Sequence, residues 1–269
     1  MRNNSVPVIL VHGWNSHPGA WKQLVSILDQ EKIPFARFDH SGREGQSLEQ
    51  IASALGGFIR SWREDTGSTG PVDIVSHSVG TCITRYYLEV CDGTRREEKV
   101  RQLIGLGPPN NGSALAELFV HPVHGPAIIN RLTGIFVPAG FDPAADVIVQ
   151  DVRPKSPFME RLRCAGTRPD IIYRIIVTAN PEGAEAFFPL FSGKTWVMTE
   201  NEEFFQTLDG DGIVAHAESA LPGISLDIIP LAEETAGDLP PANQYCHINM
   251  TKNPLVNDRI LFYLTRGGS

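Results

Sequence analysis

The chain has 269 residues, of which 42% are hydrophobic and 20% charged, a composition typical of one globular domain with a full core. The formal net charge is −8, and no dense cluster of Lys and Arg occurs, which argues against a nucleic-acid partner. The cysteines number 4, too few for a disulfide framework, and the longest apolar runs fall far short of the ~20 residues that a membrane span needs.

No apolar leader precedes the first strand-like run. Residues 1–6 are mostly polar, and β-type residues begin at Pro7, which leaves no room for a signal peptide. The sequence therefore predicts a cytoplasmic protein without an integral membrane span.

Apolar runs of strand length recur along the chain, with helical patterns between them. This alternation predicts an α/β fold with a mostly parallel sheet of about six strands flanked by helices. The runs lie at Pro7–Val11, Phe35–Phe38, Val72–Val75, Arg101–Leu106, Ile171–Val177 and Ser225–Pro230.

Three helices can be placed between and after these strands. The first begins at a capping box formed by Ser47 and Gln50, and the second carries apolar positions over 79–90. The last has Asn253 as its N-cap and Gly267 just past its end. We expect the last helix to close one flank of the sheet.

The segment from Ser113 to Arg163 interrupts the alternation. It is too long for a connection and contains large apolar residues such as Phe119, Leu132 and Phe136. We therefore expect a helical cap, or lid, inserted at 113–163 into an α/β core made of residues 1–112 and 164–269.

The most informative segment follows the third strand. Val72–Val75 leads into Ser76-His77-Ser78-Val79-Gly80, the pattern of a nucleophile elbow, in which a strained turn between strand and helix exposes a serine. Ser76 replaces the usual first glycine and is still small enough for strand and helix to approach. The pattern predicts Ser78 as a nucleophile.

An oxyanion hole is predicted beside this elbow. The first strand ends in His12-Gly13-Trp14, and the glycine lets the backbone turn so that the Trp14 amide faces the same point as the Val79 amide. We assign His12 a structural role, since a histidine that ends a buried strand is more often a hydrogen-bonded core group.

The general base must be a histidine. In proteins with this elbow the triad follows the chain order serine, acid, histidine, and His247 alone lies beyond the last predicted strand. The other candidates are His12, His17, His40, His77, His121, His124 and His216.

The acid that orients this base must lie on a fixed loop before it. Asp211 opens an Asp-Gly turn that runs into Ile213 and Val214, which would anchor the loop in the core. Asp209, Glu182 and Glu185 are the alternatives.

Four motifs together resemble the bacterial and archaeal lipase group of the α/β-hydrolases, over most of the chain. They are Val-His-Gly-Trp at 11–14, the elbow with Thr-Arg-Tyr-Tyr at 84–87, Gly-Pro-Pro-Asn-Asn-Gly-Ser at 107–113, and Asp-Gly-Ile-Val at 211–214. The resemblance implies Asp211 rather than Asp209 as the acid. It also implies a six-stranded parallel core that lacks the first two strands of larger relatives, and a lid over the acyl pocket.

No cofactor or metal is expected. Some members of that group bind calcium through an aspartate two residues after the catalytic histidine, but Asn249 stands at that position here. Zinc, dinucleotide and phosphate-loop motifs are missing from the sequence.

These features predict a serine hydrolase that cleaves carboxylic esters, a lipase or carboxylesterase, through Ser78, His247 and Asp211 and an acyl-enzyme. The apolar cap favours a small-molecule or lipid ester as substrate and offers contact with a lipid surface. The alternatives are a thioesterase, amidase or acyltransferase on the same scaffold, or an inactive binding module.

Overall fold

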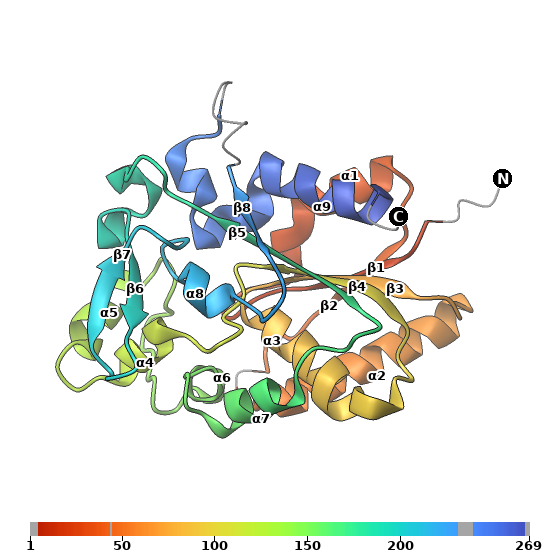
Figure 1. Cartoon of the computed structure of the whole chain (residues 1–269), viewed down its shortest axis with the longest axis horizontal. Helices are drawn as coiled ribbons and strands as arrows, with labels where there is room; N and C mark the ends of the chain where they lie inside the picture. The colour runs from red at the N-terminus through yellow and green to blue at the C-terminus, as the bar shows by residue number, and fades with distance from the viewer. Residues whose placement is uncertain (1–4, 44, 231–238, 267–269) are drawn as a thin grey trace.

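A computed structural model describes residues 5–43, 45–230 and 239–266 of the chain. Six strands form one parallel sheet in the order β2-β1-β3-β4-β5-β8 (Figure 1). They are β1 (Val8–Val11), β2 (Phe35–Phe38), β3 (Val72–His77), β4 (Val100–Leu106), β5 (Ile172–Thr178) and β8 (Leu226–Ile229). The predicted fold class and all six predicted strands are confirmed, with differences only at the strand ends.

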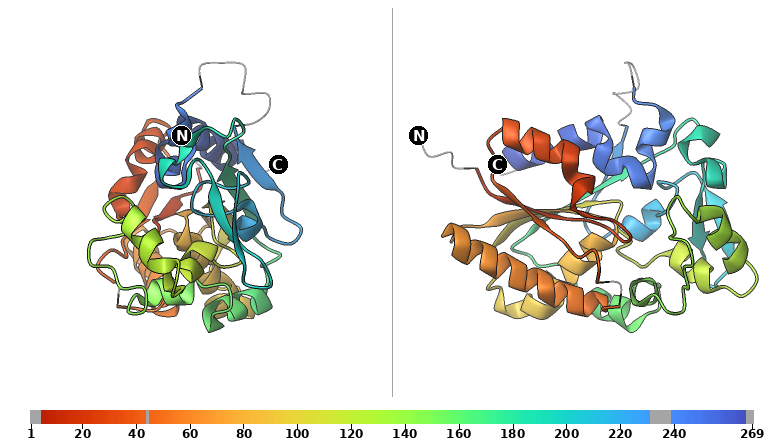
Figure 2. Two further views of the ribbon diagram at one scale, coloured as in Figure 1. Left: turned by 90° about the vertical axis from the view of Figure 1, so that its left-hand side faces the viewer. Right: turned by 180° about the vertical axis from the view of Figure 1, so that it is seen from behind.

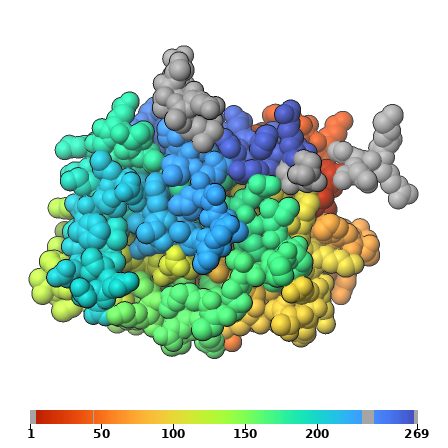
Figure 3. Space-filling view, in the orientation of Figure 1, coloured from red at the N-terminus to blue at the C-terminus, as the bar shows by residue number. Residues whose placement is uncertain are grey.

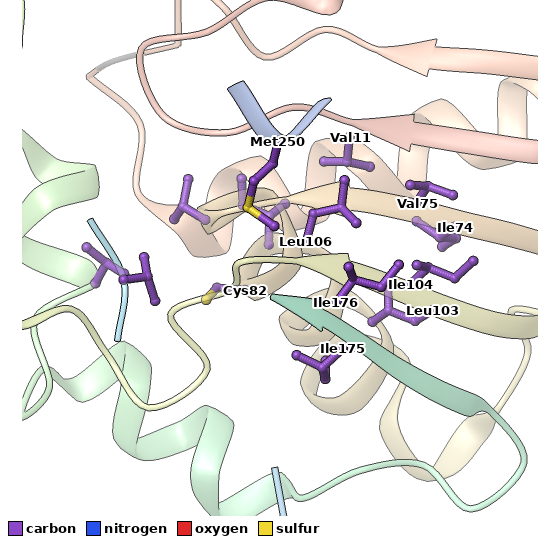
Figure 4. Close-up of a cluster of buried hydrophobic side chains, with 14 of the residues drawn as sticks. Val11, Ile74, Val75, Cys82, Leu103, Ile104, Leu106, Ile175, Ile176 and Met250 are labelled. Atoms are coloured by element: carbon purple, nitrogen blue, oxygen red, sulfur yellow. The ribbon is translucent and has the colours of Figure 1, made fainter. Parts of the chain in front are cut away.

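The central strands are buried on both faces, which explains why they are continuous apolar runs rather than alternating ones. Every residue of β1 and β3 is buried. Side chains of neighbouring strands, such as Ile74, Ile104 and Ile176, pack together with Cys82 and Met250 in the middle of the molecule (Figure 4).

Helices cover both faces of the sheet. Figures 1 and 2 show α1 and α9 on one face and α2 and α3 on the other. The long helices are α1 (Lys22–Gln30), α2 (Leu48–Thr66) and α9 (Pro254–Arg266), and the shorter ones α3 (Val79–Arg85), α4 (Ala114–Val120), α5 (Gly125–Leu132), α6 (Val147–Asp151), α7 (Pro157–Ala165) and α8 (His216–Ser219).

The predicted helix starts are confirmed. The Ser47 hydroxyl accepts a hydrogen bond from the Gln50 amide at 3.3 Å, and the Gln50 side chain accepts one from the Ser47 amide at 2.9 Å. At α9, the Asn253 side chain accepts hydrogen bonds from two amides of the first turn, at 2.9 and 3.3 Å. Gly267, the predicted helix stop, lies outside the described residues.

A helix covers the predicted range 79–90, but its hydrogen-bonding pattern changes from α to π along its length. It is an α-helix to Arg85 and continues as a π-helix over Tyr86–Asp92. The buried Arg85 guanidinium contacts the Glu89 carboxylate at 2.9 and 3.0 Å within this turn and reaches Asn110 Oδ1 at 3.1 Å. The pattern of apolar residues alone does not distinguish an α-helix from a π-helix.

The segment 113–163 contains the short helices α4 to α6 and most of α7, joined by turns. In Figure 1, α4 and α5 lie at the end of the sheet to which the strands point. An antiparallel hairpin of β6 (Thr195–Met198) and β7 (Phe204–Thr207), which the sequence analysis missed, packs beside α4. In the described part of the chain, no helix combines the length and apolarity needed to cross a bilayer.

Candidate active site

Ser78 occupies a strained turn between β3 and α3. Its backbone has φ 55° and ψ −133°, a conformation that non-glycine residues rarely adopt. The turn is held from the neighbouring strand, because the Ser78 amide donates to the Leu106 carbonyl at 2.8 Å. A Cβ at Gly80 would lie 2.4 Å from the His12 carbonyl oxygen, so only glycine lets α3 approach the end of β1 this closely.

Ser78, His247 and Asp211 form one chain of hydrogen bonds. His247 Nε2 lies 2.9 Å from Ser78 Oγ, and His247 Nδ1 lies 2.7 Å from Asp211 Oδ2. All three residues are buried. The three residues selected from the sequence therefore lie together, although 169 positions separate the serine from the histidine.

The loop that carries Asp211 is fixed by backbone contacts. The second carboxylate oxygen of Asp211 accepts hydrogen bonds from the Ile213 amide at 3.0 Å and the Val214 amide at 2.7 Å. The Asp211 carbonyl accepts one from the His247 amide at 2.8 Å, and Thr195 of β6 accepts one from the Gly212 amide at 2.8 Å. The missed hairpin thus helps to hold the acid loop.

The alternative acids are on the surface. Asp209 is exposed, and its carboxylate lies beside the Thr207 hydroxyl at 3.5 Å. Glu182 and Glu185 are exposed as well. Within the described residues, none of the three has a contact with His247.

His77 lies behind the base. Its ring centroid is 4.7 Å from that of His247, and His77 Nε2 lies 3.1 Å from the His247 carbonyl oxygen. Burial holds the pKa of His77 well below its usual value, and the neighbouring His247 lowers it further. His77 therefore packs against the base as a neutral ring.

His12 and His40 form a second buried pair beneath the turn that follows β1. Their rings stack with centroids 3.8 Å apart, and His12 Nε2 accepts a hydrogen bond from the His40 amide at 3.1 Å. Burial, together with the nearby His12, lowers the pKa of His40 to about 4. This geometry fits the structural role predicted for His12.

The remaining histidines lie elsewhere. His17 caps a short 3-10 helix, His216 contacts the Thr178 carbonyl, and His121 stacks on His124 in the segment between α4 and α5. Among the described residues, His247 is the histidine whose ring contacts Ser78.

Trp14 and Val79, whose backbone amides are the predicted oxyanion donors, both line the cavity beside Ser78. A Cβ at Gly13 would lie 3.0 Å from Ser78 Cβ, which places the Gly13-Trp14 turn directly against the serine. Within the described residues, neither amide donates a hydrogen bond to another backbone group. Two free donors beside a serine are what an oxyanion hole requires.

Gly107 is a site residue whose position the sequence analysis did not single out. It follows β4 with φ +51°, and an added Cβ would lie 2.6 Å from Asp211 Oδ2 and 3.1 Å from His247 Nδ1. The hydrogen bond between acid and base therefore passes directly over this glycine. A glycine just after a central strand was the available signal.

The residues after Gly107 bind α8, the helix that follows the acid loop, to the end of β4. The Asn110 side chain donates to the Ser219 carbonyl at 2.7 Å, and that of Asn111 donates to the Ala217 carbonyl at 3.0 Å. Through Arg85, Asn110 is also tied to the helix that begins at the elbow. The Gly-Pro-Pro-Asn-Asn-Gly-Ser motif thus joins the end of β4 to α8 and to the helix after Ser78.

An apolar cavity of about 420 Å³, including its open mouth, adjoins Ser78. Its walls come from the end of β1, the acid loop and the segment 113–163. The lining includes Trp14, Leu115, Phe119, Phe136, Ile148, Val149 and Ile213. Figure 3 shows the surface of 113–163, yellow-green to green, along the edge of the molecule beside the cyan surface of the β6–β7 hairpin.

The two buried cysteines, Cys82 and Cys246, offer no alternative nucleophile. All four are free, and burial raises the pKa of Cys82 to about 12 and that of Cys246 to about 11. A buried thiol with a raised pKa is not a nucleophile near neutral pH. Among the described residues, no group of three or more His, Cys, Asp or Glu side chains is arranged to hold a metal ion.

Comparison with known proteins gives a partial match to one family model and several structural relatives. Residues 7–137 match the palmitoyl protein thioesterase family. No curated protein matches the sequence.

Among solved structures, a mature Bacillus licheniformis lipase is 19% identical with a TM-score of 0.67, over 98% of this chain and 93% of the lipase. A monoacylglycerol lipase of Paleococcus ferrophilus is 18% identical with a TM-score of 0.52, over 96% and 93% of the two chains. A Legionella pneumophila phospholipase is 16% identical with a TM-score of 0.60, over 97% of this chain and 60% of its own length. Likeness at such identities establishes the fold alone.

Proposed function

We propose that this chain, an α/β-hydrolase by its fold, is a serine hydrolase that cleaves carboxylic esters. The observation that carries the proposal is the unbroken hydrogen-bonded chain from Ser78 through His247 to Asp211, with distances of 2.9 and 2.7 Å. In this arrangement Ser78 is the nucleophile, His247 the general base, and Asp211 the acid that orients the base.

The reaction proceeds through an acyl-enzyme. Ser78 Oγ attacks the carbonyl carbon while His247 Nε2 takes its proton, and the new oxyanion is held by the Trp14 and Val79 amides. As the bond to the leaving group breaks, His247 gives that proton to the departing oxygen. Water then attacks the acyl-serine with His247 again as base, and the acid product leaves. Asp211 stays ionised throughout and stabilises the imidazolium.

The apolar cavity favours an apolar acyl group. Its walls carry aliphatic and aromatic side chains from α4, α6 and the acid loop, and each methylene buried there contributes ~0.8 kcal/mol. In this proposal the segment 113–163 acts as a lid over the acyl group. Its exposed residues Val123 and Ile135, with exposed fractions of 73% and 55%, offer contact with a lipid surface.

A thioester is the second candidate substrate, because residues 7–137 match a thioesterase family. The same residues serve both reactions, since only the departing atom changes from oxygen to sulfur. Amide cleavage and acyl transfer to an alcohol also use this chemistry. A binding module without activity would not need the nucleophile and base held at hydrogen-bond distance.

Matched ester and thioester substrates test the proposal. Initial rates would be measured on p-nitrophenyl esters and on acyl thioesters with the same acyl chains, using the wild type and Ser78→Ala. We expect ester turnover that falls by about 10³-fold or more in the variant. Thioester cleavage that depends on Ser78, without ester cleavage, would select the second candidate, and no Ser78-dependent turnover of either kind would refute the hydrolase.

Labelling by a fluorophosphonate gives an independent readout, because it requires an activated serine but not a correct substrate. The wild type should become labelled and Ser78→Ala should not. Ser76→Ala is the matched control. It removes a buried hydroxyl that contacts Thr81 at 2.8 Å and leaves Ser78 in place, so labelling should persist.

A further inference from the structure

Two separate cavities meet at Ser78. The first is the apolar cavity of about 420 Å³, and the second has about 520 Å³ of space including its mouth. Only three residues line both: Trp14, Ser78 and Phe136. The nucleophile therefore stands at a boundary between two compartments, and two aromatic side chains form the rest of that boundary.

The two compartments differ in chemistry. The first is lined mainly by apolar side chains beneath α4 and α6. The second is lined by two histidines, His77 and the base His247, and by the polar residues Asn15 and Ser16. Ile135, at its rim, is 55% exposed, so this side opens toward solvent.

Phe136 is held firmly at the boundary. It lies in a tight turn after α5, where the Phe136 amide donates to the Leu132 carbonyl at 3.0 Å and the Gly134 amide donates to the Val137 carbonyl at 2.8 Å. The Phe136 carbonyl accepts a hydrogen bond from the Asn15 side chain at 3.1 Å. Its ring centroid lies 5.3 Å from that of Trp14 and 6.3 Å from that of His247.

We propose that Phe136 is a specificity-determining residue that separates the acyl group of the substrate from its leaving group. This inference rests on the proposed ester hydrolysis and assigns each half of the ester to one compartment. The leaving oxygen must receive a proton from His247, which lines only the second cavity. The acyl group stays bonded to Ser78 and occupies the first cavity.

This partition predicts a substrate class. The acid should be unbranched next to the carbonyl, because a second substituent there would point at the Phe136 ring. The alcohol side should be compact, uncharged and tolerant of polar groups, since the second cavity has polar walls and no Asp, Glu, Lys or Arg in its lining. An ester of a linear apolar acid with a small polar alcohol fits both requirements.

A pair of substrates on one enzyme preparation tests the partition. The ratio of kcat/KM for p-nitrophenyl valerate to that for p-nitrophenyl pivalate would be measured for the wild type and Phe136→Ala. Both esters share the leaving group and differ only in branching of the acid. We expect the ratio to fall about tenfold or more in the variant, because the wall that rejects the branches is gone.

Phe141→Ala is the matched control. The Phe141 ring also contacts Trp14, with centroids 5.5 Å apart, but it lines neither cavity. Its substrate ratio should stay within about twofold of the wild type, on the same grounds of pocket specificity. Equal shifts in both variants would overturn the proposal, because they would indicate a general loosening around Trp14.

Two further outcomes remain distinguishable. If the wild type cleaves the valerate ester through Ser78 and the ratio is unchanged in Phe136→Ala, the partition is refuted and the hydrolase stands. If the wild type cleaves no ester or thioester, the proposed function fails and the partition with it. Should Phe136→Ala not fold, Phe136→Leu takes its place, with an expected fall in the ratio of about threefold.

Discussion

The turn at Ser78 and the segment 113–163 face each other across the same cavity but are built differently. The turn is made of main chain packed on main chain: Ser78 donates to Leu106, and Gly80 leaves no room between α3 and the end of β1. The segment 113–163 is made of short helices whose ends are held by side chains, such as Ser113, Asp146 and Ser156 at their N-caps.

Because of this difference, the turn at Ser78 determines the catalytic geometry, and the segment 113–163 determines which substrates fit. Backbone packing fixes the nucleophile, base and acid within a few tenths of an ångström, which catalysis requires. Side-chain contacts hold the walls of the acyl cavity, and these can change residue by residue without disturbing the turn. Substitutions near the triad should therefore have large effects, and substitutions that touch only the segment 113–163 should have small ones.

The largest effect is expected from Asp211→Asn. In this variant the amide oxygen would stay with the Ile213 and Val214 amides, so the amide NH2 would face His247 Nδ1 and donate to it. The imidazole then adopts the wrong tautomer, and the imidazolium loses its partner. We expect kcat to fall by about 10³ to 10⁴-fold with the fold intact, as measured by ester turnover and by circular dichroism. Asp209→Asn, two positions away and exposed, is the control and should stay within about twofold of the wild type. A comparable loss in both variants would contradict the assignment of the acid.

Gly107→Ala should follow in size. The new methyl group would lie 2.6 Å from Asp211 Oδ2, and the backbone at φ +51° is unfavourable for alanine. We expect kcat to fall by about 10² to 10³-fold because acid and base are pushed apart. Gly105→Ala tests whether the loss is specific, since its Cβ would meet Thr81 rather than the triad. If both variants lost stability equally while Gly107→Ala kept its kcat, the role of Gly107 would be only structural.

The fold was predictable because its signals are local. The central strands of the sheet are short apolar runs that must be buried, and the helix starts at Ser47 and Asn253 have their own capping residues. The hairpin was missed because β6 and β7 have mostly half-buried or exposed residues, so neither run is continuous or alternating. Its contribution, a hydrogen bond from the Gly212 amide to Thr195, exists only after folding.

The site was predictable where chain order and turn chemistry determine it. Ser78 is marked by the small residues around it, and His247 by its place after the last strand. The acid was narrowed to Asp211 only through a family resemblance, because Asp209 and Asp211 are equivalent to any rule about loops. Phe136 could not be identified at all, since its place between two cavities depends on how the turn after α5 packs against Trp14.

The stacked pair His12 and His40 should make the turn after β1 sensitive to acid. The pKa of His40 is about 4 in the folded protein against 6.5 in the unfolded chain, because burial and His12 disfavour its charge, while Asp39 opposes this. The unfolded state therefore binds a proton that the folded state does not as the pH falls from about 6.5 to about 4. The free energy of unfolding should drop by about 3 kcal/mol across this window and stay constant below it.

Urea denaturation of the wild type and His40→Gln at a series of pH values isolates this contribution. Glutamine stays neutral and its amide can still donate to the His12 carbonyl, which His40 Nε2 contacts at 2.9 Å. The difference in unfolding free energy between the two proteins should change by about 3 kcal/mol between pH 7 and pH 4 in favour of the variant. Parallel pH dependences would mean that His40 does not titrate in this range.

The smallest effect is expected at the side-chain contact between Trp14, in the turn after β1, and Asp146, in the segment 113–163. The Trp14 indole donates to Asp146 Oδ2 at 3.1 Å, while Asp146 Oδ1 caps α6 by accepting from the Val149 amide at 2.9 Å. Asp146→Ser keeps a capping hydroxyl and removes the indole contact, and Trp14→Phe removes the same contact from the other side. We expect each change to lower kcat/KM by about threefold to tenfold, because a hydrogen bond to a charged group is lost at partial exposure.

A double-mutant cycle determines whether this contact couples the segment 113–163 to the oxyanion turn. The double variant should lose less than the product of the two single losses, with a coupling energy of about 0.5 to 1.5 kcal/mol. Asp142→Ser is the control, because Asp142 is exposed and caps only the Ala144 amide. Additive losses would show that the two substitutions act independently, so that the contact between the Trp14 indole and Asp146 does not couple the segment 113–163 to the oxyanion turn.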